Sequence, residues 1–372
     1  KKSGHDVTII DEEIAPVTES ALAEQVKSLK KPYIFGLSCL TAGIARGYEL
    51  AGLIKRRYPD GIVIFGNIHP SVMPDEVLGN KDADIVVRGE GEFVFVDIAA
   101  RMDEKKSLSG IKNLWIKNND NQIEKNELRP LIDPLDQLEH ADFGIYDDRT
   151  FYRPYHGKIY RCIDYELSRG CLYNCTFCLS PFQRSIYGFP KNFRREKSID
   201  KIIDEISYLK NRHKLDIIRY QDETFLSIGE DKLKDLSAAY KKHVNLPFII
   251  EAAINTITEK KVEYLKKMGC LSISIGLESG NQHIRDNVLK KPFFTNAEVI
   301  SKIKLINKNR IRATLFNIIG FPLETKEMIF DSINLSHAAK APYCLVSFFQ
   351  PWEGTRLRDL CVQNGMLDSD SK

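Results

Sequence analysis

The chain has 372 residues, of which 43% are hydrophobic and 28% are charged, and its formal net charge is +3. This length exceeds the usual size of one hydrophobic core and predicts two domains. The charge is too small to indicate nucleic-acid binding by itself. No apolar run reaches the ~18 residues that span a bilayer.

The first region, residues 1–105, alternates apolar strands with amphipathic helices. The predicted strands are 5–11, 32–39, 61–66 and 83–92. A helix is predicted over 41–59, with Ile44, Tyr48, Ala51 and Ile54 on one face. This alternation predicts a parallel sheet covered on both faces, in a doubly wound, Rossmann-like domain. Because "KKSG" is typical of a helix end, we expect an earlier strand and helix to be missing.

Residues 106–158 break this rhythm. The segment "NLWIKNNDNQIEKN" has a turn-rich centre between two short strands and predicts a hairpin. The following "LRPLIDPLDQLEHADFGIYDD" is rich in proline and acidic residues, and we interpret it as an inter-domain linker.

The last region, residues 159–372, contains six predicted strand and helix units and indicates a partial (β/α)6, TIM-like barrel. Its predicted strands are 163–168, 215–222, 247–254, 271–278, 313–321 and 343–350, the last as a buried strand. Chemistry in such folds lies at the carboxyl ends of the strands. Polar residues gather there: Arg169, Asp222, Glu223, Asn255, Glu278, Ser279 and Gln350.

Three of the eight cysteines, Cys171, Cys175 and Cys178, lie in "SRGCLYNCTFCLS". The other five are scattered, which is a poor disulfide framework and indicates a metal site in a cytoplasmic protein. A zinc site normally closes with four ligands, whereas a cubane iron–sulfur cluster with three thiolates keeps one iron open. Zinc, a disulfide with a spare thiol, or no ligand at all remain the alternatives.

The Cys-x3-Cys-x2-Cys spacing, with Phe177 before the last cysteine, resembles the radical S-adenosylmethionine (SAM) superfamily. The segments "RYQDETF", "SIGLESGNQHIRDNVLKK" and "FNIIGFPLET" add to the resemblance, which spans roughly 160–356. It implies that the three cysteines bind a 4Fe-4S cluster whose open iron chelates SAM. One electron would then release a 5′-deoxyadenosyl radical.

The same resemblance implies roles for residues at the strand ends. Phe177 would contact adenine, and Ile319 and Gly320 would offer backbone groups to it. Glu278, with Ser279 beside it, would accept hydrogen bonds from the ribose. Asp222 and Glu223 would bind the methionine ammonium, although "QDETF" lacks the glycines that the family often has there.

The first region resembles the cobalamin-binding domain often fused before such a barrel. The segments "GLSCLTAG", "FGNIHPSVMPDE" and "VVRGEGE" would form loops at the carboxyl edge of a parallel sheet, where doubly wound folds bind ligands. The implied cobalamin contacts are Ser38, Gly66, His69, Gly89 and Glu90. The Asp-x-His-x-x-Gly motif of stand-alone domains is absent from the sequence. His69 is therefore either the cobalt ligand or a histidine that orders its loop, and cobalamin without a protein ligand is a third option.

Together these resemblances imply a cobalamin-dependent radical SAM enzyme, most often a methyltransferase acting on an unactivated carbon or phosphorus centre of a small molecule. Other members catalyse ring contraction or cyclisation. An electron donor such as flavodoxin or ferredoxin is the expected partner. A methylthiotransferase is disfavoured because the first region offers only Cys39 for an additional cluster. A non-catalytic electron carrier or sensor is disfavoured by the open coordination position.

Overall fold

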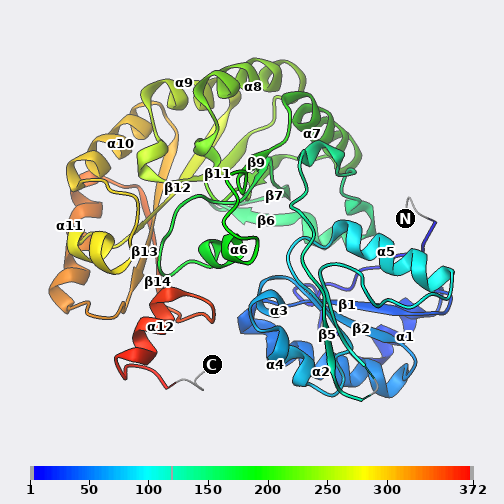
Figure 1. Ribbon diagram of the computed structural model, residues 1–372. Coiled ribbons are helices and arrows are strands. Elements are labelled where there is room, and N and C mark those ends of the chain that lie inside the picture. Colours follow the sequence, from blue (N-terminus) through cyan, green and yellow to red (C-terminus); the bar gives the residue numbers. More distant parts are fainter. Residues whose placement is uncertain (1–3, 119, 369–372) are drawn as a thin grey trace. The chain divides into compact units, whose positions relative to one another are not determined.

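The structure is a computed structural model that describes residues 4–118 and 120–368 (Figure 1). Within this part the chain divides into two compact units. Unit 1 holds the residues up to 132 together with 141–150, and unit 2 holds 133–140 together with the residues from 151 on. The domain borders at 105 and 158 stay predictions.

Unit 1 is built on a five-stranded sheet in the order β1-β2-β3-β4-β5, in which β1 to β3 are parallel. The predicted hairpin, β4 and β5, extends this sheet in antiparallel pairing. The strands are β1 (Ile34–Ser38), β2 (Ile62–Gly66), β3 (Ile85–Val87), β4 (Leu114–Lys117) and β5 (Ile123–Lys125). The helices are α1 (Glu19–Val26), α2 (Ile44–Arg57), α3 (Ile68–Val72), α4 (Pro74–Gly79) and α5 (Glu92–Asp103).

Two separate cores cover the two faces of this sheet. Successive residues of a strand point to opposite faces, so Val63 and Phe65 pack with α1, α2 and α4, whereas Ile64 packs with α5 through Val94 and Ile98. This three-layer arrangement confirms the doubly wound fold.

The strand predicted over 5–11 is wrong. These residues have no regular structure, and β1 is the edge strand of the sheet. Ile10 packs against the core, but Val7 is 44% exposed, so the segment runs over the core without hydrogen bonding to a strand.

Unit 2 is built on a seven-stranded sheet in the order β14-β13-β12-β11-β10-β7-β6. Its strands are β6 (Tyr152–Tyr155), β7 (Lys158–Tyr165), β10 (Ile217–Tyr220), β11 (Phe248–Ala252), β12 (Cys270–Glu278), β13 (Arg312–Ile319) and β14 (Tyr343–Phe348). All pair in parallel except β6, which is antiparallel to β7. The six parallel strands confirm the (β/α)6 prediction.

The helices of unit 2 follow one another along the outer side of the curved sheet in Figure 1. They are α7 (Ile199–His213), α8 (Glu230–His243), α9 (Glu259–Met268), α10 (Asn296–Lys308) and α11 (Lys326–Ala339), with α6 (Ser180–Ile186) and α12 (Arg356–Gln363) outside this row. The Ser198 hydroxyl caps α7 by accepting from the Lys201 amide, and the helix buries Ile202, Ile206 and Leu209 on its inner face. A capping box of Thr295 and Glu298 begins α10.

The prediction of a buried last strand is wrong. Every residue of β14 is exposed, and Phe348 is 72% exposed. The physical reason is that β14 lies at the sheet edge and pairs on one side only, with β13. A continuous apolar run therefore does not by itself distinguish a central strand from an edge strand.

Candidate cofactor-binding site

The three clustered cysteines lie in the loop between β8 (Ser168–Arg169) and α6, directly after the first parallel strand of the unit 2 sheet. Gly170 begins this loop with φ +91°, a left-handed backbone that suits glycine. A Cβ atom at this position would lie 2.3 Å from the carbonyl oxygen of Phe193. Only glycine therefore lets the chain turn into the cysteine loop here.

Backbone contacts fix the middle of this loop. The Thr176 amide donates to the Leu289 carbonyl at 2.9 Å, and the Thr176 hydroxyl donates to the Val288 carbonyl at 2.7 Å. The Leu357 amide donates to the Thr176 carbonyl at 2.9 Å. The loop is thus held by the π-helix η7 (Ile284–Val288) and by the first turn of α12.

The three thiols are half-buried, and burial raises the pKa of each. The pKa of Cys175 rises to about 11, and the neighbouring Cys178 and Cys171 add to this increase. The Ser180 amide donates to the Cys178 sulfur at 3.4 Å. In residues 4–118 and 120–368, we find no three His, Cys, Asp or Glu side chains whose positions could hold a metal ion directly.

The chemistry of these three cysteines fits an iron–sulfur cluster that takes three thiolate ligands from the protein. The thiols share one loop that is fixed in its middle, each is only half-buried, and they act on one another electrostatically. Soft thiolates select iron–sulfur clusters, and binding must deprotonate the thiols that burial keeps neutral.

Glu278 ends β12 at the same edge of the sheet, in a left-handed conformation with φ +66°. A Cβ atom on Gly276 would lie 2.4 Å from Glu278 Oε1, so the glycine makes room for the carboxylate. Lys291 Nζ lies 3.1 Å from the same oxygen, and the two side chains are only 9% and 11% exposed. Burial lowers the pKa of Lys291, but the charges of Glu278 and Cys175 outweigh it, and the pKa is raised overall.

Lys291 also connects this ion pair with the rest of the site. Its ammonium lies 5.8 Å from the centroid of the Phe177 ring. Phe177 packs edge-on against Phe321, with ring centroids 6.2 Å apart. A cation, a carboxylate and an aromatic ring therefore meet beside the cysteine loop.

Asp222 and Glu223 lie next to the loop and bind its backbone. The buried Asp222 accepts from the Ser168 amide at 2.7 Å and from the Ser168 hydroxyl. Burial raises the pKa of Asp222 to about 7, although the hydrogen bonds from Ser168 act to lower it. Glu223 Oε1 accepts from the Gly170 amide at 3.2 Å. Both carboxylates thus position the start of the cysteine loop.

The other predicted SAM contacts also lie at this edge, and several of their polar groups are already bonded. The Gly320 amide donates to Glu324 Oε2 at 2.7 Å, and the Ile319 carbonyl accepts from the Phe349 amide at 2.9 Å. Ser279 is fully buried, and its hydroxyl accepts from the Asn281 amide at 3.2 Å.

In unit 1 the predicted cobalamin contacts gather at the carboxyl edge of β1, β2 and β3. Ser38 ends β1 and accepts from the Asn67 side chain at 3.0 Å, and Gly66 ends β2. The space beside Gly66 is open, since no heavy atom beyond its chain neighbours lies within 4 Å of the position that a Cβ would take. Gly89, with φ +70°, and Glu90 follow β3. Small residues and open space suit the close approach of a flat macrocycle.

Two side chains reinforce this edge. The Gly89 amide donates to the Ser71 hydroxyl at 3.2 Å, and Glu90 Oε2 accepts from the Ile132 amide at 2.7 Å. Exposed apolar side chains lie nearby in sequence, Leu40 after β1 and Phe93 at the start of α5. Exposed apolar side chains of this kind suit contact with a corrin ring.

His69 is only 2% exposed, in α3 after β2. Its Nδ1 lies 3.2 Å from the Thr41 hydroxyl, and its Nε2 lies 4.0 Å from Glu76 Oε1. The contact with Thr41 shows that His69 orders its loop, whereas the distance of 4.0 Å between Nε2 and Glu76 is longer than a hydrogen bond.

Residues 165–335 match the Radical SAM superfamily, and residues 1–99 match the B12 binding domain. The fold and the three-thiol loop agree with both matches. The chain is thus a member of the radical SAM superfamily with an N-terminal cobalamin-binding domain. The predicted cofactors, a 4Fe-4S cluster, SAM and cobalamin, are confirmed by this pair of domains.

Among similar proteins, the uncharacterized methyltransferase PH0819 of Pyrococcus horikoshii is 28% identical over 365 residues, which cover 98% of this chain and 76% of the relative. The anaerobic magnesium-protoporphyrin IX monomethyl ester cyclase of Rubrivivax gelatinosus is 25% identical over 93% of this chain and 61% of its own length. The chain thus spans less than two thirds of that relative.

The solved structure of the radical SAM methyltransferase TsrM from Kitasatospora setae, with cobalamin and a [4Fe-4S] cluster bound, has a similar fold. The TM-score is 0.76 at 16% identity, covering 97% of this chain and 70% of that chain. This likeness concerns the fold of the two domains.

Sequence reasoning missed Lys291 and Glu324. Lys291 stands in the quoted segment "SIGLESGNQHIRDNVLKK", but nothing in the sequence distinguishes it from the exposed Lys290 beside it. Glu324 follows "FNIIGFP", and its position after Gly320 is the only available signal. In residues 4–118 and 120–368 we find no helix that is long and apolar enough to cross a membrane.

Proposed function

We propose that this protein is a cobalamin-dependent radical SAM methyltransferase that acts on an unactivated carbon or phosphorus centre of a small molecule. The observation that carries the proposal is the loop of three thiols at the carboxyl end of the first parallel strand, beside the buried pair of Glu278 and Lys291. Three thiolates leave one iron of a cubane open.

In this function Cys171, Cys175 and Cys178 would hold the cluster. When bound with SAM, the cluster supplies one-electron chemistry that generates a 5′-deoxyadenosyl radical. The chain's own residues bind and orient the substrate of that chemistry. Glu278 accepts from ribose hydroxyls, Lys291 holds the Glu278 carboxylate in place, and Phe177 packs against the adenine.

Asp222 and Glu223 are proposed to act on the methionine end. In the structure they bind the backbone of Ser168 and Gly170, which places them directly before Cys171. When they are ionised, these side chains keep acceptor capacity for the SAM ammonium, since an ionised carboxylate accepts several hydrogen bonds.

Cobalamin would lie on the edge formed by Ser38, Gly66, Gly89 and Glu90, and would supply the methyl group. We propose that His69 orders this edge through Thr41 and Glu76 and would not bind cobalt. Replacing His69 with alanine should then leave the optical spectrum of bound cobalamin unchanged in shape.

The electron would come from flavodoxin or ferredoxin. The eight cysteines, all free thiols, support a cytoplasmic location, because thiols stay reduced there.

The test is anaerobic reconstitution of the chain with iron, sulfide and cobalamin, followed by optical and electron spin resonance spectra. We expect a corrinoid band and a 4Fe-4S signal that changes when SAM is added. Reduction should release 5′-deoxyadenosine. A cluster signal that SAM leaves unchanged would refute the proposal.

Cys175→Ala should lose the cluster and SAM cleavage but keep the corrinoid band. Cys344→Ala is the matched control, because Cys344 is an exposed thiol on β14 outside the loop. It should keep both cofactors and cleave SAM at the wild-type rate.

A radical SAM cyclase is the second candidate, favoured by the likeness to the Rubrivivax cyclase over 93% of this chain. The products of SAM distinguish the two functions during turnover. A methyltransferase forms S-adenosylhomocysteine beside 5′-deoxyadenosine, whereas a cyclase forms 5′-deoxyadenosine without it.

A further inference from the structure

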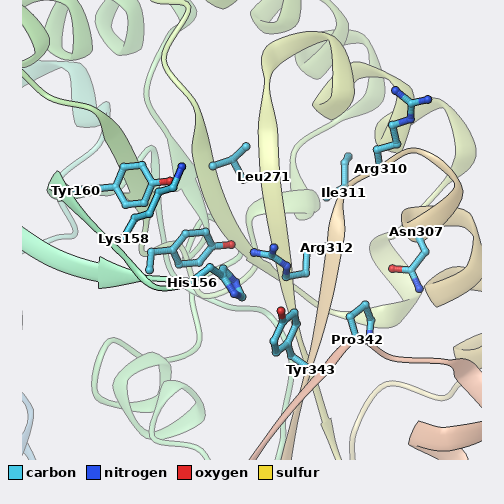
Figure 2. Close-up of a pocket in the computed structure, with 11 residues that line it drawn as sticks. His156, Lys158, Tyr160, Leu271, Asn307, Arg310, Ile311, Arg312, Pro342 and Tyr343 are labelled. Carbon is cyan, nitrogen blue, oxygen red and sulfur yellow. The ribbon is translucent and has the colours of Figure 1, made fainter.

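Unit 2 has an open cavity at the amino-terminal end of its parallel strands. Its volume is about 680 Å³, within the ~300–1,000 Å³ range of small-ligand sites. It is lined by first residues of β7, β12, β13 and β14 and by the turn between β6 and β7 (Figure 2). A strand rises about 3.3 Å per residue, so Leu271 in the cavity lies about 23 Å from Glu278 at the other end of β12.

This cavity lies where the two edges of the curved sheet meet. The sheet order places β6 at one edge and β14 at the other. The His156 ring, in the turn after β6, lies 4.7 Å from the Tyr343 ring of β14. Arg312 lies 5.8 Å from the Tyr155 ring and 5.1 Å from the Tyr343 ring. Arg312 and these three rings thus form a seam of side-chain contacts between the two edges of the sheet at this end.

The seam is positively charged. Lys158, Arg310 and Arg312 line the cavity, and no Asp or Glu does. Among the described residues, none of these three cations forms an ion pair with a carboxylate within 4.0 Å. Burial, and then the charge of Arg312, lower the pKa of His156. This direction agrees with a cavity lining that contains cations and no carboxylate.

The rings add a second recognition element. In Figure 2 the His156 and Tyr343 side chains lie close to Arg312, and Lys158 and Tyr160 come from β7. Guanidinium and ammonium groups prefer phosphate oxygens, and tyrosine and histidine rings stack on planar bases. The volume exceeds what a single inorganic phosphate needs.

We propose that this seam is a binding site for a nucleotide, an aromatic base carrying several phosphates, separate from the SAM site. The phosphates contact Lys158, Arg310 and Arg312, and the base stacks on the exposed rings of His156 and Tyr343. Because the site joins the two edges of the sheet, the bound nucleotide also stabilises the folded state of unit 2.

The experiment is isothermal titration of ATP into the reconstituted full chain, with SAM present in excess so that the SAM site is filled. We expect one ATP per chain and an increase in the unfolding temperature. Adenosine and tripolyphosphate should each bind at least about tenfold more weakly than ATP, because each carries only one of the two recognition elements.

Lys158→Gln and Arg312→Gln should each weaken ATP binding at least about fivefold. The Lys158 side chain is exposed and forms no hydrogen bond or ion pair among the described residues, so its variant tests the site while the backbone pairing of β6 and β7 is kept. The matched control is Lys304→Gln, an exposed lysine on α10 outside the cavity, which should bind ATP as the wild type does.

Three results would overturn the proposal. These are no ATP binding, unchanged binding by both Lys158→Gln and Arg312→Gln, or tripolyphosphate binding as tight as that of ATP. The last result would mean that the seam holds any polyanion and does not recognise a base. Loss of ATP binding in Lys158→Gln and Arg312→Gln, with binding kept in Lys304→Gln, assigns ATP to the seam whether or not the cluster assembles, so this proposal and the proposed function fail separately.

Discussion

The two sheets hold their candidate cofactor sites at the same kind of edge but by different means. In unit 2 the site is made of side chains that other groups fix, such as Glu278 with Lys291 and Asp222 with Ser168. In unit 1 it is made mainly of small residues and backbone, with Gly66 beside open space and Gly89 in a left-handed turn.

This difference follows from the chemistry of the two ligands. A cluster needs soft donor atoms in set positions, and SAM carries charges that require charged partners. A corrin ring offers a broad apolar face that needs room more than partners. Substitutions in unit 2 should therefore act by removing or displacing these fixed groups, whereas substitutions in unit 1 should act by filling the space that the corrin ring needs.

The largest effect is expected at the turn into the cysteine loop. Gly170→Ala would place a Cβ atom 2.3 Å from the Phe193 carbonyl oxygen, on a backbone with φ +91°. We expect loss of the cluster and a decrease of about 3 kcal/mol in the free energy of unfolding. Iron analysis and chemical denaturation measure the two.

The control is Gly188→Ala, which shares a positive φ of +72° but has no heavy atom within 4 Å of its Cβ position. It should cost about 1 kcal/mol and keep the iron. Equal iron loss in both variants would mean that the backbone conformation, and not the close approach to Phe193, determines whether the chain keeps the cluster.

The next effect concerns the ion pair of Glu278 and Lys291. Lys291→Met leaves the buried Glu278 carboxylate without its cation, and we expect a decrease of about 3 kcal/mol in the free energy of unfolding. Adding Glu278→Gln should recover most of this loss in a double-mutant cycle. Lys290→Met, at the exposed neighbouring residue, should change little.

The raised pKa of Asp222 predicts that the free energy of unfolding depends on pH. Its pKa of about 7 in the folded chain lies above its ordinary value, so the folded state binds the proton more tightly and is stabilised at low pH. That stability is lost as the pH rises towards 7. Relative to Asp222→Asn, the wild type should lose about 2 kcal/mol between pH 5 and pH 7. Parallel unfolding profiles of the two proteins would contradict this.

The smallest effect is one of space. Gly276→Ala would displace the Glu278 carboxylate, because the new Cβ would lie 2.4 Å from Oε1. SAM affinity should fall about tenfold, or about 1.4 kcal/mol, while the iron content stays at the wild-type level. Unchanged SAM affinity would exclude Glu278 as a ribose contact.

The sequence was sufficient for the architecture, because apolar periodicity and six strand and helix units are local signals. It failed for β14, whose apolar run does not reveal that the strand lies at the sheet edge. It also missed Lys291, since a lysine is predicted to be exposed until the fold places it beside Glu278. The cysteine loop was predictable because its three donors are adjacent in sequence.

Metal analysis of oxygen-free protein tests the central claim, that the three thiols hold a cubane with one open iron in a chain that also binds cobalamin. After reconstitution we predict about four iron atoms and about one cobalt atom per chain, with negligible zinc. Stoichiometric zinc with negligible iron would contradict the account.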